Sequence, residues 1–209
     1  IGYGPSLHDH WQQLKDFEGY IFTGSKAHDF LVERGITPHF HLELDYREHK
    51  VDFVKLVSPE TQYVVATQIH PLYLDRLLAR DPNAKLELFH SDIPSGEPSP
   101  GYPKVAAQWD VGLQAAYMAY RMGLQDQVWI GMDASTRDGQ THAGHHGGIV
   151  AEDTRVRVGD TIYSTTAMLL RQAMFCELML CKYPFIKPII TGSGMLRPFL
   201  QFRKRASVS

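Results

Sequence analysis

Residues Gln127–Gly148 read QVWIGMDASTRDGQTHAGHHGG, and this stretch decides the fold class. Its apolar start, Val128–Ile130, predicts a strand that is buried on both faces. The strand runs to the carboxylate of Asp133, and a polar loop rich in histidine and glycine follows. An open α/β sheet usually presents its site in this way, at the carboxyl end of a buried strand. The alternative is a solvated surface loop in which the histidines cluster without a function.

Strand and helix patterns alternate on both sides of this stretch. We expect strands at residues 20–23, 38–45, 62–67, 85–89, 127–133 and 188–191, and helices between them, among them 105–122 and 167–183. In the strand expected at residues 38–45, apolar Phe40 and Leu42 alternate with His41 and Glu43. The connections are short, which predicts an α/β fold with a Rossmann-like, doubly wound, mostly parallel sheet and helices on both faces. Thr154–Val158 and Thr161–Ser164 flank Gly159-Asp160 and predict a small β-hairpin excursion.

Length and composition favour one globular domain over residues 1–200, followed by a disordered basic tail at 201–209. The formal net charge of −2 indicates that nucleic acid is not a partner. No apolar run reaches the length of a membrane span, so we expect no membrane partner. Cys176 and Cys181 lie five residues apart in an apolar helix and cannot easily bridge, which predicts reduced core thiols and a cytoplasmic protein. The chain starts at Ile1 inside a motif, so we expect the first strand to begin upstream.

The N-terminal segment Ile1–Leu7, IGYGPSL, predicts the end of a first strand that passes into a helix. Gly2 and Gly4 allow a ligand to approach the backbone closely, while Pro5 suits a first helical position and Ser6 can cap. A helix N-terminus behind the glycines would favour a phosphate. The segment is neither the Gly-x-Gly-x-x-Gly fingerprint nor a Walker loop, and Gly-Pro-Ser is also ordinary turn chemistry.

Ligands of an open α/β sheet bind outside the carboxyl ends of its strands. The polar residues expected at that edge are Ser6, Thr23, Ser25, Lys26, Asp45, Gln68, His70, His90, Asp92, Asp133, Ser135 and the loop histidines. Asp45 and Asp133 are the candidate ligands for Mg²⁺, which takes carboxylate and phosphate oxygens. The structural alternative is that each aspartate caps a following helix or turn.

The loop histidines His142, His145 and His146 suit acid–base chemistry, because imidazole titrates near neutral pH. Zinc is an alternative, with His39-x-His41 as a further pair of ligands, but the sequence lacks a compact pattern such as His-Glu-x-x-His. A serine hydrolase is also an alternative, although no Gly-x-Ser-x-Gly elbow is present.

Several segments together resemble the 6-hydroxymethylpterin diphosphokinase MptE-like domain family, which also forms the core of motility accessory factors that glycosylate flagellin. They are Gly2–Leu7, Gly35–Asp45, Gly112–Asp133, Asp138–His142 and the hairpin that leads to Thr165-Thr166. The resemblance implies a Rossmann-like fold with a nucleotide at the Gly-Pro-Ser turn. In the pterin branch it implies Mg²⁺-dependent transfer of diphosphate from ATP to a hydroxymethyl pterin.

The bacterial sialyltransferases that use a CMP-activated sugar are a second, more distant relative with a Gly-Pro-Ser turn. The resemblance to them implies that Gly4, Pro5 and Ser6 touch the nucleotide, and that His142 or His145 is the base.

The combined hypothesis is a nucleotide-dependent transferase that acts on a small-molecule substrate, with His142, His145 and Asp133 as the catalytic candidates. The remaining residues expected to bind nucleotide are Gly2, Gly4, Pro5, Ser6, Thr23, Ser25, Asp45, Gln68, Gly112 and Ser135. Asp45 and Asp133 would position Mg²⁺ or a ribose. Two alternatives stay open: glycosyl transfer from a CMP-sugar, and a non-catalytic nucleotide-binding module. The sequence also leaves a homo-oligomer open.

Overall fold

The structure is a computed structural model, and it describes residues 1–92, 101–143 and 154–206. The chain divides into two compact units. The first unit combines Ile1–Lys15 with Ala119–Ser209, and the second unit is Asp16–Met118. The sequence predicts one domain over residues 1–200, and the division into units falls inside that range.

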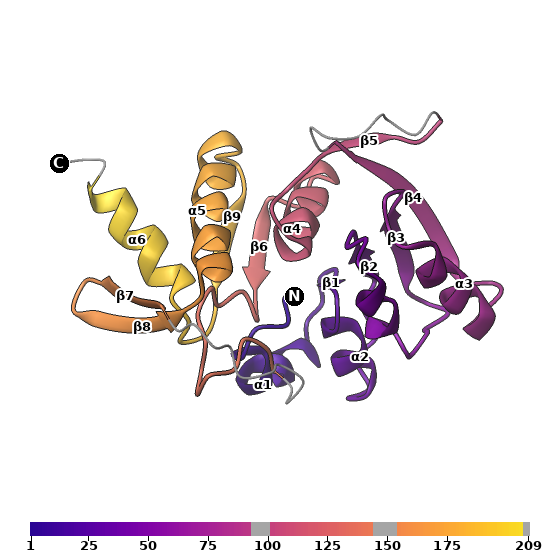
Figure 1. Ribbon diagram of the computed structural model, residues 1–209, viewed down its shortest axis with the longest axis horizontal. Helices are drawn as coiled ribbons and strands as arrows, with labels where there is room; N and C mark the ends of the chain where they lie inside the picture. The colour runs from indigo at the N-terminus through magenta and orange to yellow at the C-terminus, as the bar shows by residue number, and fades with distance from the viewer. Residues whose placement is uncertain (93–100, 144–153, 207–209) are drawn as a thin grey trace. The chain divides into compact units, whose positions relative to one another are not determined.

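The second unit contains a five-stranded sheet in which every neighbouring pair is parallel (Figure 1). The strand order follows the chain order. The strands are β1 (Phe22–Gly24), β2 (Phe40–Glu43), β3 (Gln62–Ala66), β4 (Lys85–Asp92) and β5 (Lys104–Ala106). The helical segments are α2 (Ala27–Val32), the 3-10 helix η2 (Glu48–Phe53), α3 (Pro71–Arg80) and α4 (Val111–Arg121), whose last turn belongs to the first unit. This alternation confirms the predicted α/β class with a mostly parallel sheet.

Strand β2 is buried on both faces. Leu42 on one face and His41 and Glu43 on the other are each at most 1% exposed. The alternation of apolar and polar residues is typical of a half-buried strand, but residues on both faces of β2 are buried. The polar side chains of this strand must therefore find partners inside the protein.

Strand β5 is absent from the sequence-based prediction, which places a helix over residues 105–122. Lys104–Ala106 instead pairs with the end of β4, where Lys104 lies opposite His90, and the helix begins at Val111. A three-residue strand is set by its pairing partner and not by its own sequence, which explains why local patterning missed it.

In the described part of the first unit, strand β6 (Asp126–Trp129) pairs in parallel with β9 (Lys187–Ile190), and β7 (Thr154–Val158) pairs with β8 (Thr161–Thr165) as a hairpin. The hairpin agrees with the prediction, and Gly159 supplies the positive φ, 61°, that its tight turn requires. The helices are α1 (Leu7–His10), the 3-10 helix η1 (Trp11–Leu14), α5 (Ala167–Lys182) and α6 (Leu196–Ala206). Figure 1 shows the hairpin beside α6, with which β7 is in contact.

The N-terminal segment lies along the end of β6. The amide of Gly2 donates to the Ile130 carbonyl over 2.9 Å, and the amide of Gly4 donates to the Gly131 carbonyl over 2.8 Å. Ile1–Gly4 forms no strand, so the predicted end of a first strand is represented only by these two backbone hydrogen bonds. The prediction that β6 is buried on both faces is wrong for Val128, which is 39% exposed, and right for Trp129.

The C-terminal residues 201–206 are helical and form the end of α6, whereas the sequence predicts a disordered tail from residue 201. Buried Leu200 anchors this helix, and the Arg203 guanidinium binds the Glu177 carboxylate of α5 over 3.0 Å. Both cysteines are free, as expected, but only Cys176 is a core thiol, because Cys181 is exposed. Among the helices of the described residues, none is both long and apolar enough to cross a bilayer.

Candidate functional site

The carboxylate of Asp133 lies at the centre of the first unit, just beyond β6. Its side chain is buried, and its Oδ2 atom accepts the backbone N–H of Ser6 over 2.9 Å. The Ser6 hydroxyl in turn accepts the N–H of Gly131 over 3.2 Å. Burial raises the pKa of Asp133 above its ordinary value, and the hydrogen bonds from Ser6 oppose this shift. Asp133 thus fastens the Gly-Pro-Ser turn to the strand end, although 127 positions separate the two residues.

Glycines surround this carboxylate closely. A Cβ atom on Gly194 would lie 2.6 Å from Oδ1 of Asp133, and one on Gly4 would overlap Oδ2. A Cβ atom on Gly192 would lie 2.7 Å from the Ser6 hydroxyl oxygen. These positions require glycine because the backbone approaches the carboxylate too closely for any side chain. The shell of Gly4, Gly192 and Gly194 around Asp133 and Ser6 is called the glycine shell below.

The backbone donors of the turn already have partners within the protein. Gly2 and Gly4 bond to the β6 end, Ser6 bonds to Asp133, and the amide of Leu7 bonds to the Gly4 carbonyl. The following helix α1 has only four residues. The reason given for a phosphate at this turn, a helix N-terminus with open N–H groups, therefore does not hold. Any ligand contact here has to come from side chains or from close approach to the glycines.

The loop after Asp133 folds back on the turn. Asp138 and Gly139 have φ values of 50° and 73°, and Arg137 and Gln140 exchange both backbone hydrogen bonds, over 3.0 and 2.8 Å. This is the geometry of a tight turn with two left-handed central residues, which Asp-Gly favours. It returns the chain to the N-terminal segment, where the amide of Ala143 donates to the Tyr3 carbonyl over 2.9 Å.

The returning loop places His142 against Tyr3. The two ring centroids are 5.7 Å apart, and the His142 side chain is half-buried. Tyr3 lies between Gly2 and Gly4, so the structure joins the candidate base to the predicted nucleotide turn. His145 and His146 lie outside the described residues, and the roles predicted for them stay predictions.

Arg137 is carried by the same loop and was not predicted from the sequence. Its guanidinium binds the Asp9 carboxylate over 2.6 Å and the Ser193 hydroxyl over 3.3 Å, and its side chain is 38% exposed. A partly exposed guanidinium can bind an anionic substrate group. The Asp-Gly turn after Arg137 was a usable signal, since it predicts that Arg137 and Gln140 face each other. No local signal in the sequence connected the Gly192-Ser193-Gly194 segment with Asp133.

Ser135 has a structural position. Its hydroxyl accepts the backbone N–H of Met195 over 3.1 Å, and its side chain is 5% exposed. The Asp133 carbonyl accepts the next amide, that of Leu196, over 3.0 Å. Together these bonds fix the start of α6. Pro5, the last of the candidates at the turn, is also buried.

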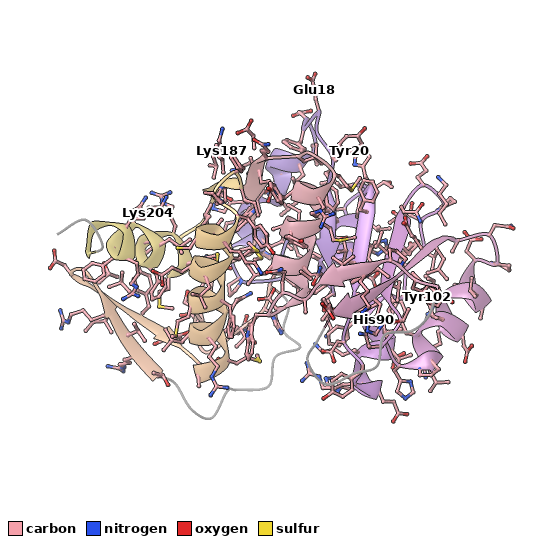
Figure 2. The ribbon with its side chains drawn as sticks, turned by 90° about the horizontal axis from the view of Figure 1, so that it is seen from above. Glu18, Tyr20, His90, Tyr102, Lys187 and Lys204 are labelled. Carbon is pink, nitrogen blue, oxygen red and sulfur yellow. The ribbon has the colours of Figure 1, made fainter. Side chains whose placement is uncertain are left out.

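The remaining candidates belong to the second unit, and two of those described in this paragraph, Thr23 and Gln68, have side-chain hydrogen bonds within it. Thr23 is fully buried, and its hydroxyl donates to the Phe40 carbonyl. Gln68 bonds both the N–H and the carbonyl of Ser91 and also contacts His90, which is labelled in Figure 2, so it bridges the ends of β3 and β4. Ser25, just after β1, has an unusual positive φ of 54°. Gly112 lies in the first turns of α4. Their predicted contacts with nucleotide stay predictions.

Asp45 follows β2 and forms ion pairs with Arg47 and with Lys50, the latter over 3.8 Å. Partial burial works against its ionisation, but the hydrogen bonds and charge of Arg47 outweigh that effect and lower the pKa of Asp45. A carboxylate that already binds two cations is a poor magnesium ligand. One oxygen of the Asp133 carboxylate already accepts the N–H of Ser6, and the residues packed closely around it are the glycines of the glycine shell.

The described residues therefore do not form a ready magnesium site. Residues 1–92, 101–143 and 154–206 contain no group of three or more His, Cys, Asp or Glu side chains that could hold a metal ion. The zinc alternative proposed His39 and His41 as ligands. The His39 ring already accepts the N–H of Ile21 over 3.0 Å, and His41 is fully buried.

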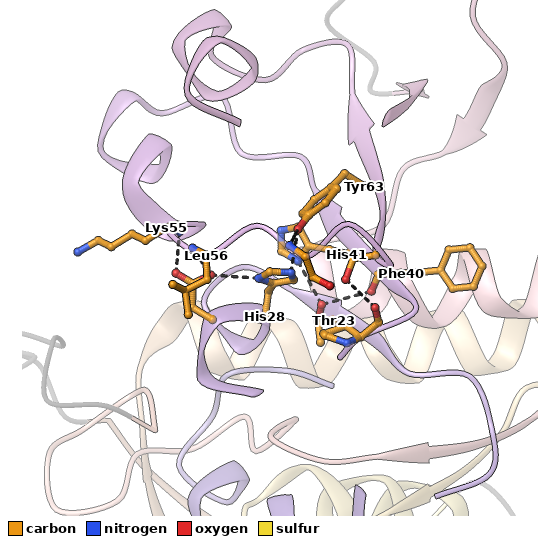
Figure 3. A network of polar contacts seen from close by, with 11 residues as sticks. Thr23, His28, Phe40, His41, Lys55, Leu56 and Tyr63 are labelled. Atoms are coloured by element: carbon orange, nitrogen blue, oxygen red, sulfur yellow. Dashed lines mark hydrogen bonds and ion pairs between the residues drawn. The ribbon is translucent and has the colours of Figure 1, made fainter. Parts of the chain in front are cut away.

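A second polar cluster lies in the core of the second unit (Figure 3). The register of β1, β2 and β3 puts Thr23, His41 and Tyr63 on one face, and α2 adds His28. The His41 Nδ1 atom lies 3.1 Å from the Thr23 hydroxyl, and the Tyr63 hydroxyl lies 3.2 Å from the His28 Nε2 atom. Because the Thr23 hydroxyl donates to the Phe40 carbonyl, the His41 Nδ1 atom is the donor in this contact. Burial lowers the pKa of His41 and keeps its ring neutral.

The buried cluster ties a loop to the sheet. Tyr63 accepts the N–H of Ser58 over 2.8 Å, and His28 bonds to Asp29 over 3.0 Å. Asp29 accepts the N–H of Lys55 over 2.7 Å. These bonds are typical of a structural network, although the Nε2 atom of His41 is buried without a hydrogen-bond partner within the described residues.

Comparison with known proteins supports the resemblance. Residues 1–139 match the family model described as "6-hydroxymethylpterin diphosphokinase MptE-like". The solved structure of the MAf glycosyltransferase from Magnetospirillum magneticum AMB-1 is similar, with a TM-score of 0.66 at 15% sequence identity. The similarity covers 99% of this chain and 36% of that protein, so the chain spans about a third of its length. No curated protein matches the chain.

Proposed function

The chain belongs to the 6-hydroxymethylpterin diphosphokinase MptE-like family, and on this premise we propose that it is a nucleotide-dependent transferase. The observation that carries the proposal is the loop of residues 136–143. It holds the half-buried imidazole of His142 and the partly exposed guanidinium of Arg137 directly after the buried Asp133. The first group can accept a proton, and the second can bind an anion.

The lead reaction is transfer of diphosphate from ATP to a hydroxymethyl pterin-like acceptor. The acceptor hydroxyl attacks the β-phosphorus, the bond from that phosphorus to the α-phosphate oxygen breaks, and AMP leaves. His142 takes the hydroxyl proton, and Arg137 binds the negatively charged phosphates. Gly2 and Gly4 let the donor approach the turn, and Asp133 holds that turn in place through Ser6. Mg²⁺ is proposed to enter with the nucleotide's phosphates, because the described carboxylates offer no ready site.

The second candidate is glycosyl transfer from a CMP-sugar. Two observations favour it: the similar structure is that of a glycosyltransferase, and both candidate magnesium ligands, Asp45 and Asp133, are engaged by protein groups. In this reaction the acceptor hydroxyl forms the new glycosidic bond, CMP leaves, and His142 again takes the proton. A non-catalytic nucleotide-binding module is the remaining alternative.

The test is calorimetric titration with ATP, CMP, UDP and GTP, each with and without Mg²⁺, followed by assays for AMP or CMP release. ATP binding that requires Mg²⁺ supports diphosphate transfer, and CMP binding that survives EDTA supports glycosyl transfer. No binding of any nucleotide contradicts both.

Matched variants separate binding from chemistry. We expect His142→Ala to keep nucleotide binding and to lower turnover by about 100-fold or more, as for loss of a general base. His8→Ala is the control, since His8 is an exposed histidine of the same unit. Asp133→Asn should keep the fold and lose turnover. Full activity in both the His142 and the Asp133 variants would reject the assignment and leave the binding module.

A further inference from the structure

Two lysine ammonium groups of the second unit share one aromatic ring. The Nζ atom of Lys26 lies 4.3 Å from the centroid of the Phe53 ring, and the Nζ atom of Lys50 lies 4.0 Å from it. Lys26 follows β1, and Lys50 lies in η2, which follows β2. β1 and β2 are parallel neighbours, so the pair belongs to the carboxyl edge of the sheet, where α/β proteins bind ligands. Lys26 and Lys50 with Phe53 are called the lysine pair below.

The charges around this pair are not balanced. Lys50 shares the Asp45 carboxylate with Arg47, and Lys26 has no ion-pair partner within the described part of the chain. Lys55 adds a further positive charge near Lys26.

Burial disfavours the charged form of both lysines. It lowers the pKa of both Lys26 and Lys50, and their mutual repulsion adds to this effect at Lys50. Like charges that are held together and partly removed from water gain most from an anion placed between them.

We propose that the lysine pair binds a phosphate or diphosphate group. The Phe53 ring fixes both ammonium groups by cation–π contact, so little side-chain entropy is lost when the anion binds. The residue before Lys26, Ser25, adds a hydroxyl and holds a left-handed φ of 54°, a strained conformation for a residue other than glycine. The site lies wholly within the second unit and stands whether or not the first unit is a transferase.

Inorganic diphosphate is the first probe, titrated calorimetrically into the full chain at low salt and again at 0.3 M salt. We expect binding that weakens with salt, because ion pairs of partly exposed lysines are screened. The double variant Lys26→Met, Lys50→Met keeps the apolar stems against Phe53 and should bind diphosphate about 10- to 100-fold more weakly. The double variant Lys26→Arg, Lys50→Arg keeps both charges and should retain most of the binding.

The matched controls are Lys15→Met and Lys182→Met. Each of these lysines also lies over an aromatic ring, at 5.2 Å from Trp11 and 5.4 Å from Tyr183, but without a second lysine. Neither control should change diphosphate binding. Circular dichroism and thermal unfolding of each variant establish that it is folded.

Two further measurements sharpen the test. The first asks whether the phosphate group belongs to a nucleotide or to another ligand, and the second asks whether diphosphate binds to the second unit or to the first. If ATP binding also falls in the methionine double variant, the phosphate belongs to the nucleotide; if only diphosphate binding falls, it belongs to another phosphorylated ligand. Either result supports the site. Diphosphate binding that is lost in Arg137→Gln and kept in the methionine double variant overturns it and points to the first unit. No diphosphate binding, or equal weakening by the lysine controls, also overturns it.

Discussion

Two buried carboxyl groups follow buried strand residues in this protein, one in each unit, and they are held in opposite ways. Asp133 in the first unit accepts the N–H of Ser6, which is 127 positions away in the sequence. Glu43 in the second unit is 1% exposed and accepts the N–H groups of the next two residues, Leu44 and Asp45, over 2.9 and 3.1 Å. Burial raises the pKa of both groups, and that of Glu43 reaches about 7.

The difference lies in what surrounds each carboxyl group. Around Asp133 the neighbours are the glycine shell and a loop that carries His142 and Arg137, so small residues and exposed polar groups meet there. Glu43 shares its strand face with His41 in the packed core, and one of its oxygens, Oε2, is buried without a hydrogen-bond partner in the described structure. The first arrangement joins distant segments of the chain, whereas the second leaves a polar atom without a hydrogen-bond partner inside a core.

The largest expected effect is at the glycine shell. Gly194→Ala puts a Cβ atom 2.6 Å from both the Cα and the Oδ1 atom of Asp133, so backbone has to move. Overpacking of this kind should lower the free energy of unfolding by about 3 kcal/mol or more. Urea unfolding followed by circular dichroism measures it.

Gly35→Ala is the control for this substitution. It has open space around the new atom and only the cost of its positive φ of 74°, about 1 kcal/mol. Equal losses in the two variants would show that Asp133 has no tight shell.

The next largest effect is the pH dependence that Glu43 confers on the free energy of unfolding. Its pKa is raised in the folded protein from an ordinary 4.5 to about 7, so the folded state holds the proton more tightly than the unfolded state. The corresponding stability is complete below about pH 4.5 and is lost as pH rises to about 7, and it amounts to about 3 kcal/mol. Glu43→Gln should remove this loss, which urea unfolding of both proteins at pH 5 and pH 8 would detect.

The difference in stability between wild type and Glu43→Gln isolates the contribution of Glu43, because all other titratable groups are present in both proteins. A parallel decline in stability of wild type and Glu43→Gln between these pH values would contradict the raised pKa. A decline that remains in the variant is expected from Asp133, whose pKa is shifted in the same direction.

A smaller effect is expected in the histidine network of the second unit. Tyr63→Phe removes the hydroxyl that accepts the Ser58 N–H and contacts His28. Two buried polar groups then lose a partner, which should cost about 2 kcal/mol. Tyr46→Phe is the control, since Tyr46 is 70% exposed, and it should change stability by less than about 0.5 kcal/mol. Thermal unfolding of the two variants would show no difference if the network were merely accidental.

The sequence predicted features that depend on local patterns. Alternating strands and helices and the hairpin at Gly159 each have a signal within a few residues, and each has a counterpart in the structure. The attachment of Ile1–Gly4 to the end of β6 was not predicted, because it joins segments that lie far apart in the sequence.

The missed features depend on contacts between distant segments. Nothing near Glu43 in the sequence shows that both faces of β2 are covered, and nothing near Gly194 shows that Asp133 lies against it. The lysine pair is of the same kind, because Lys26 and Lys50 meet only through the ring of Phe53. The expectation of open N–H groups at Ser6 failed for this reason too, since Asp133 reaches that amide through tertiary structure.

The smallest expected effect on stability concerns a third carboxylate, Asp45, which is neither fully buried nor enclosed by glycine. Its partners are Arg47, which is about half exposed, and Lys50, and such pairs contribute less than about 1 kcal/mol to stability. Asp45→Asn should therefore barely change the unfolding transition, in contrast to Gly194→Ala. It should also release Lys50 and strengthen diphosphate binding by about threefold, because one negative charge leaves the neighbourhood of the lysine pair. Weaker diphosphate binding in Asp45→Asn would instead show that the Asp45 carboxylate holds Lys50 in the position that binds the ligand, and it would contradict the argument from charge alone.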